Sequence, residues 1–265
     1  MPMTFHKYID NPSESPSVYT MRDMYRQMYR KKFEELLVRE SGKLLYKIIN
    51  VGDANDTHYF VFKIPSESLA GLYYDVVIKL WAGTNGLKNA ANFKDYFVQF
   101  FSNDQAFTYT FEYSFNKNKL LIPELRSKCS EIALKQPAAI KNPKNEVWYV
   151  KSFVFAFYAM ERYNLFSRPV ANQVGVKYNR AEFLSNIASF DRKMEEHAKL
   201  TQEKKKKEER ERLAKQAEQR LTRHGSYMVV TSDKAPVAKT PKTTKSARVG
   251  KVAKVTTKSK VKRRG

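Results

Sequence analysis

The sequence predicts an α+β fold: a mainly antiparallel sheet covered by helices, followed by a long charged C-terminal helix and a disordered basic tail. Segments between about residues 43 and 116 show the alternation and turn residues typical of strands, and the flanking segments show helical spacing of apolar residues. Charged helix-forming residues continue beyond residue 200 with only a thin apolar stripe. From residue 232 the chain has no aromatic residue, and such a segment cannot bury enough apolar surface to offset its ordering entropy.

These features divide the 265 residues into four parts. We expect a flexible N-terminal arm at residues 1–19, because three prolines lie there among serines and asparagines. A globular body follows at residues 20–178, then a long helix at residues 179–225, which is charged in its second half. Residues 226–265 form the disordered lysine-rich tail.

The body is expected to begin with a helix at residues 20–41. Methionine, tyrosine and leucine recur there near the helical period, Thr20 can act as the N-cap, and Gly42 stands where a C-terminal cap would. Arginines and lysines alternate with the apolar residues. The helix therefore either packs its apolar side on the sheet or presents a basic face to phosphate or an acidic partner.

Three strands are expected next, at residues 43–51, 58–64 and 72–81. A turn rich in glycine and aspartate separates the first two, and the third is the most apolar and could be central. His58 alternates with phenylalanines, which favours a position on the sheet surface over a role as a metal ligand.

Residues 93–115 are expected to form a long hairpin with an aromatic face. In its second half aromatic residues alternate with polar ones, at Phe107, Tyr109, Phe111, Tyr113 and Phe115. A period of two is the geometry of an extended chain with one buried side. Residues 102–105 supply a turn. We expect a neighbouring helix to cover this face, and the alternative is an exposed platform on which a ligand stacks.

Helices are predicted at residues 121–135, 145–166 and about 180–224. Pro123 suits the start of the first, which would bury Cys129. The second is apolar on most of its circumference. In the third, which starts at an Asn179 cap, apolar residues step by four and three up to residue 200, a spacing typical of coiled coils. Beyond that point the helix is expected to project into solvent or to pack on another subunit.

The positive charge of the chain is concentrated at its C-terminal end. Residues 1–200 carry a net charge of +7, residues 201–233 carry +3, and residues 234–265 carry +12 with no acidic residue. Such a segment attracts polyanions and releases their counterions without reading base sequence, and its lack of aromatic residues argues against stacking on single strands. The predicted nucleic-acid contacts are Lys234, Lys239, Lys242, Lys245, Arg248, Lys251, Lys254, Lys258, Lys260, Lys262, Arg263 and Arg264.

Other interpretations of the tail stay open. It can be a solubilising segment with no dedicated partner. Residues 258–264 resemble a nuclear-import cluster, and Thr240 precedes a proline as in a phosphorylation site.

The sequence predicts neither an enzyme nor a metal or cofactor site. The four histidines are scattered, without metal-ligand spacing, and the glycine-rich phosphate and nucleophile motifs are absent. The single cysteine excludes an intrachain disulfide. Neither a signal-peptide pattern nor an uncharged run long enough to span a bilayer is found, so we expect no membrane partner and no small-molecule substrate.

Residues 73–129 contain four motifs that together resemble a family of tailed-bacteriophage virion structural proteins: DVVIKL, YFVQFFSN, FTYTFEYSFNKN and LLIPELRSKC. The similarity continues loosely through residues 148–166 and excludes the basic tail. The resemblance implies a structural particle component made in a bacterial host, for which a position near the genome is open, and it carries over no binding residue.

The expected function is therefore a noncatalytic component of a bacteriophage virion, whose tail contacts nucleic acid nonspecifically. Its expected location is the virion, and the host cytoplasm during assembly. The alternative is a host-cell nucleic-acid-binding or regulatory protein that uses the tail for DNA or RNA binding or for nuclear import.

Overall fold

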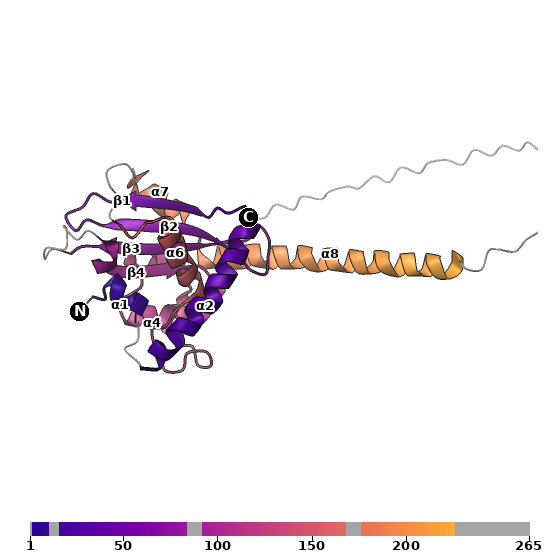
Figure 1. Cartoon of the computed structure of the whole chain (residues 1–265), viewed down its shortest axis with the longest axis horizontal. Coiled ribbons are helices and arrows are strands. Elements are labelled where there is room, and N and C mark those ends of the chain that lie inside the picture. The colour runs from indigo at the N-terminus through magenta and orange to yellow at the C-terminus, as the bar shows by residue number, and fades with distance from the viewer. Residues whose placement is uncertain (1, 11–15, 84–91, 168–175, 226–265) are drawn as a thin grey trace, which may run out of the picture. The chain divides into compact units, whose positions relative to one another are not determined.

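The structure is a computed structural model (Figure 1). It describes residues 2–10, 16–83, 92–167 and 176–225, without the side chains of residues 16–26 and 221–225. The chain divides into two compact units, Met1–Arg212 and Leu213–Gly265. The first unit holds a five-stranded, mostly antiparallel sheet with helices, which confirms the predicted α+β class.

The sheet has the strand order β4-β3-β2-β1-β5. Its strands are β1 (Leu45–Asn50), β2 (His58–Pro65), β3 (Tyr73–Trp81), β4 (Phe97–Ser102) and β5 (Val176–Lys177). Neighbouring strands are antiparallel, except that the two-residue β5 pairs parallel with β1. The first three predicted strands are confirmed within a few residues. The middle position of the order belongs to β2 rather than to the more apolar β3, although β3 is also an interior strand.

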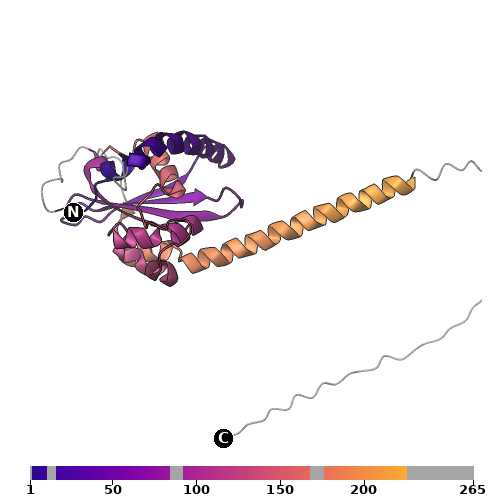
Figure 2. The same ribbon diagram turned by 90° about the horizontal axis from the view of Figure 1, so that it is seen from below.

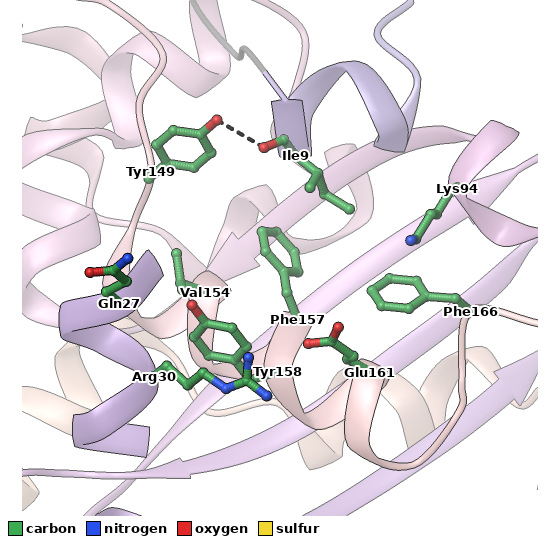
Figure 3. A pocket seen from close by; sticks show the side chains of 10 residues that line it. All are labelled: Ile9, Gln27, Arg30, Lys94, Tyr149, Val154, Phe157, Tyr158, Glu161 and Phe166. Carbon is green, nitrogen blue, oxygen red and sulfur yellow. Dashed lines mark hydrogen bonds between the residues drawn. The ribbon is translucent and has the colours of Figure 1, made fainter. Parts of the chain in front are cut away.

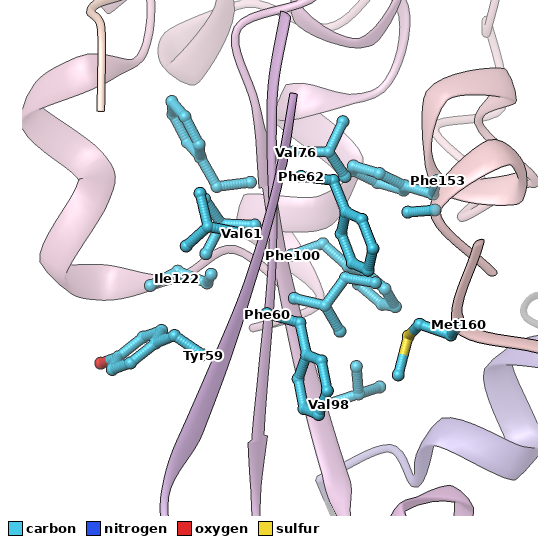
Figure 4. Close-up of a cluster of buried hydrophobic side chains, with 14 of the residues drawn as sticks. Tyr59, Phe60, Val61, Phe62, Val76, Val98, Phe100, Ile122, Phe153 and Met160 are labelled. Atoms are coloured by element: carbon cyan, nitrogen blue, oxygen red, sulfur yellow. The ribbon is translucent and has the colours of Figure 1, made fainter. Parts of the chain in front are cut away.

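Both faces of the sheet are covered at β2, β3 and β4, because helices lie on both sides of it (Figure 2), whereas β1 and β5 are mostly exposed. Phe60 and Phe62 of β2 point to one face, and Tyr59 and Val61 point to the other (Figure 4). On the first face lie helices α1 (Phe5–Asp10), α2 (Pro16–Arg39) and α6 (Lys151–Arg162) and the 3₁₀ helix η2 (Phe93–Asp95). On the second lie the 3₁₀ helix η3 (Pro123–Lys128) and helix α7 (Arg180–Asn186). A strand buried on both sides reads as a nearly continuous apolar run.

Aromatic rings make the contacts between these layers. The ring centroid of Phe100 in β4 lies 4.4 Å from that of Tyr8 and 4.9 Å from that of Phe153. On the opposite face, Tyr59 lies 4.5 Å from Phe183. The core therefore spans the sheet, with residues from both ends of the body.

The N-terminal region differs from the predicted flexible arm. Helix α1 falls within residues 1–19, and its Phe5 and Tyr8 are fully buried. The Tyr8 hydroxyl donates a hydrogen bond to the carbonyl of Trp148, at 2.9 Å. Two aromatic residues three apart place both rings on one face of a helix, and this pattern outweighs the nearby prolines. Helix α2 likewise begins at Pro16, ahead of the predicted cap at Thr20.

The outer edge of β4 is paired along its length. Thr4 forms an antiparallel bridge with Phe97, and Leu121 forms a parallel bridge with Phe100. The amide of Phe100 donates to the carbonyl of Leu120 at 2.7 Å, and the amide of Val98 donates to the carbonyl of Met3 at 3.0 Å. Two segments from distant parts of the chain thus occupy the hydrogen-bonding groups of this edge.

The predicted aromatic hairpin is wrong in its second half. Only β4 is extended, and helices α3 (Gln105–Thr110) and α4 (Glu112–Lys117) follow it. Asp104 begins α3 as its N-cap, accepting a hydrogen bond from the amide of Ala106 at 2.9 Å. Phe107 and Phe115 are fully buried, with ring centroids 5.3 Å apart. Aromatic residues four positions apart satisfy a period of two and a helical period equally, and the cap at Asp104 selects the helix.

The two helices predicted after the hairpin are shorter than expected. Residues 121–135 form η3 and helix α5 (Glu131–Lys135) instead of one helix. Cys129 is a buried free thiol as predicted, whereas Ile132, three residues later, is 70% exposed. Helix α6 begins at Lys151 rather than at Asn145, because Asn145 has a left-handed backbone with φ of 55° and does not cap a helix.

The long helix predicted at residues 180–224 is two helices, α7 and α8 (Phe190–Gly225). Asn179 caps α7 as predicted, accepting hydrogen bonds from the amides of Ala181 and Glu182. The break follows from Ala188, whose amide donates to Asp75 at 3.0 Å and whose carbonyl accepts from Asn103 at 3.1 Å. These bonds fix the backbone to the sheet. Within the described residues, no helix is both long and apolar enough to cross a membrane.

Candidate functional site

The twelve predicted nucleic-acid contacts, from Lys234 to Arg264, lie outside the described residues. The structure therefore neither brings them together nor separates them. Helix α8, which precedes the tail, has every residue from 202 to 220 exposed. The four consecutive lysines at residues 204–207 are part of this exposed stretch.

The histidines do not form a metal site in the described part of the chain. His6 and His58 each lie 3.0 Å from a nearby aspartate, and His58 is buried rather than on the sheet surface. His197 is half-buried and lines a pocket, and the side chain of His224 is among those not described. Among the described residues, no group of three histidine, cysteine, aspartate or glutamate side chains could hold a metal ion.

The strongest candidate site in the body is a polar cavity of about 340 Å³, which we name the Asp104 pocket. It forms where the turn between β2 and β3 meets the first residues of α3 and α6 and the start of α8. The polar side chains that define it are Glu67, Tyr74, Asp104, Lys151, Ser152 and His197.

Asp104 supplies the buried charge of this pocket. Its side chain is 8% exposed, and one carboxylate oxygen accepts the capping bond from the amide of Ala106. Burial raises the pKa of Asp104, and the capping bond, the positive charge of Lys151 and the hydroxyl of Ser152 oppose that rise. The carboxylate is thus partly desolvated, and the protein groups around it replace only part of the stabilisation that water would give its negative charge.

Two hydroxyl groups accompany this carboxylate. Ser152, the second residue of α6, is 2% exposed, and its Oγ atom makes no hydrogen bond with good geometry to any described group. Burial, followed by the nearby charge of Asp104, raises the pKa of Tyr74 to about 12, so its hydroxyl stays protonated at neutral pH. A buried hydroxyl without a partner is uncommon in folded proteins and indicates a place for a further polar group.

The rim of the pocket carries an ion pair. The Nζ atom of Lys151 lies 3.0 Å from a carboxylate oxygen of Glu67, and both side chains are about one-third exposed. Lys151 therefore donates to Glu67 at the mouth, although its charge still acts on Asp104.

A second pocket, of about 300 Å³, is mainly apolar (Figure 3). Phe157, Tyr158 and Phe166 form much of its wall, and the Nζ atom of Lys94 lies 4.7 Å from the centre of the Phe166 ring. None of the described residues lining it has a buried polar atom without a partner. It is the weaker candidate, because no buried polar atom of the described residues in its wall lacks a hydrogen-bond partner that a ligand could supply.

Comparison of the chain with models of protein families, with curated proteins and with solved structures gives no match.

Sequence reasoning missed the Asp104 pocket, because it placed Asp104 in a hairpin turn and Ser152 inside an apolar helix. One signal could have found Asp104: an aspartate three residues before aromatic residues spaced by four is typical of a helix N-cap. Nothing local to Ser152 indicates that it faces a cavity, since that depends on segments distant in sequence.

Proposed function

We propose that the protein is a noncatalytic structural component of a bacteriophage particle, and that its basic C-terminal segment contacts nucleic acid nonspecifically. One observation carries the nucleic-acid part: residues 234–265 hold twelve positive charges and no negative one, whereas the first 200 residues carry only +7. The particle part rests on the resemblance of residues 73–129 to virion structural proteins.

The physical basis of the binding is counterion release. Each phosphate neutralised by a lysine or arginine frees condensed cations, so affinity falls as salt rises. If all twelve charges contact duplex DNA, the slope of log K against log salt reaches roughly −11. Partial contact gives a proportionally shallower slope.

Residues 179–225, which form α7 and α8, are the proposed contact to other virion proteins or to a second copy. The first apolar residues of this segment, Phe183, Ile187 and Phe190, are buried in the body of the same chain. The proposed contact therefore belongs to the later, exposed part of α8, where Leu213 is 56% exposed and charges of both signs alternate. Pairs such as Glu208 with Arg212 have the order that favours helix formation in solvent.

The test measures affinity for duplex DNA across a salt series, comparing the full chain with a variant that ends at residue 231. We expect the truncated chain to bind far more weakly and with a much shallower slope. A control with a scrambled tail sequence keeps its composition and should bind as the natural chain does, because the contact does not depend on residue order. Equal affinity of the full and truncated chains would contradict the proposal.

The alternative is a host-cell nucleic-acid-binding or regulatory protein that uses the same charge for DNA or RNA binding or for import. Mass spectrometry of purified particles separates the two. Detection of the chain at a fixed ratio to known capsid proteins supports the particle component, and its absence supports the host-cell protein.

A further inference from the structure

The Asp104 pocket has an unbalanced charge at its buried end. Of the charged residues that line it, Asp104 is the buried one, whereas Glu67 and Lys141 are exposed and Lys151 is half-buried. Lys151 is already paired with Glu67. The inner part of the pocket therefore presents a carboxylate whose countercharge is at the rim, an arrangement that favours a cation over an anion or a neutral group.

The geometry around this carboxylate fits a group with several donors. One oxygen of Asp104 is used by the capping bond, which leaves acceptor capacity on the carboxylate. The Oγ atom of Ser152 makes no hydrogen bond of good geometry, although its hydroxyl lies close enough to Asp104 to favour the charged carboxylate, and the Tyr74 hydroxyl lines the same cavity. A primary ammonium group has three donors and no acceptor, so it can use all three oxygen-bearing side chains.

The remaining wall is apolar enough for a short hydrocarbon chain. Ile64, Phe155 and Ala106 line the cavity beside the polar groups. Its volume of about 340 Å³ equals that of on the order of ten water molecules, which is ample for a chain of a few carbons.

We propose that the Asp104 pocket binds a small primary alkylammonium ion, with its ammonium group at Asp104, Ser152 and Tyr74 and its alkyl chain along Ile64 and Phe155. This site is separate from the basic tail. A protein of net charge +22 repels cations in general, so saturable binding of an ammonium ion requires a specific local site.

The experiment is calorimetric titration of the full chain with n-butylammonium chloride at constant ionic strength and pH 7.5. We expect one saturable site. n-Butanol and butyrate, which share the alkyl chain but are neutral or negative, should show no saturable binding. Absence of saturation with n-butylammonium, or equal binding of n-butanol, overturns the proposal.

Three variants locate the site. Asp104→Asn keeps an N-cap side chain of the same size but removes the charge, and it should weaken binding at least about tenfold. Ser152→Ala should weaken it about threefold to tenfold. Glu67→Gln frees Lys151 to turn toward Asp104, so it should weaken binding about threefold while changing only an exposed residue.

Asp95→Asn, at an exposed position in η2, is the matched control and should bind as the natural chain does. Circular dichroism of each variant checks that it is folded. If Asp104→Asn does not fold, Glu67→Gln and Ser152→Ala decide the question. Unchanged affinity in the folded variants contradicts the assignment.

Discussion

Glu112 is a buried carboxyl group placed where it is stable mainly in its protonated form. It is 1% exposed, and neither of its carboxylate oxygens has a hydrogen-bond partner of good geometry. Burial raises the pKa of Glu112 to about 7, although Thr108 and Cys129 lie close enough to favour its charged form to a smaller degree. Burial, followed by the nearby Glu112 carboxyl, raises the pKa of the Cys129 thiol.

The raised pKa of Glu112 predicts a loss of stability as the pH rises from about 4.5 to about 7. Because the folded state holds this proton more tightly than the unfolded chain does, the contribution of Glu112 is most favourable below about pH 4.5. It is lost as the pH rises through 7, by about 3 kcal/mol in total. Glu112→Gln keeps the neutral shape and should be more stable than the natural chain at pH 8, but not at pH 5.

Urea unfolding at pH 5 and pH 8 measures this difference. Glu131→Gln is the control. The Glu131 side chain is 88% exposed, so this substitution should leave the pH dependence of stability unchanged. If natural and Glu112→Gln chains lose equal stability between the two pH values, Glu112 is not the group responsible.

At the scale of elements, the junction between α7 and α8 depends on one polar cluster. Asp75 is fully buried and accepts hydrogen bonds from Lys63, from the Asn103 side chain and from the amide of Ala188. Asn103 also accepts from the amide of Asp75 at 2.8 Å. The cluster joins two strands to the start of α8, so its hydrogen bonds support each other.

Asn103→Ala should therefore destabilise the protein by about 2–3 kcal/mol, because the buried amide of Asp75 and the half-buried carbonyl of Ala188 lose their partner. Urea unfolding at pH 7 measures the cost. Asn116→Ala, at a half-buried position whose side chain takes no part in the cluster, should change stability by about 0.5 kcal/mol or less. A similar small effect for both variants would show that the junction does not depend on Asn103.

The elements that could be predicted from sequence are those with one dominant local signal. Strands β1 to β3 follow from alternating apolar runs bounded by turns, and the cap of α7 follows from Asn179. The failures have tertiary causes. Phe107, Phe111 and Phe115 fit both periods, and the break at Ala188 exists because Asp75, more than a hundred residues earlier, takes its amide.

The pocket was less predictable than the fold. Its polar residues come from six separate stretches of chain, and no two of the acceptors at its buried end are neighbours in sequence. Asp104 and Ser152 meet only because α3 and α6 begin at the same place on the sheet. The spacing of residues in the sequence therefore does not predict that Asp104 and Ser152 lie in the same pocket.

For the whole molecule, the distribution of charge predicts that folding and polyanion binding are independent. The tail has no aromatic residue with which to join the core. A chain ending at residue 231 should unfold in urea at the midpoint of the full chain, within about 0.5 kcal/mol in free energy. A larger change would mean that the tail stabilises the body, and the DNA comparison would then need variants with neutralised lysines instead of a truncation.

The paired edge of β4 limits how neighbouring copies of the protein can associate at high local concentration. A sheet that ends in unpaired amides and carbonyls recruits neighbouring chains into continuous β-structure, and this risk grows with local concentration. Here Thr4 on one part of the strand and Leu120–Leu121 on the other take up that capacity within a single chain. Many copies can consequently be packed closely together without merging their sheets through this strand.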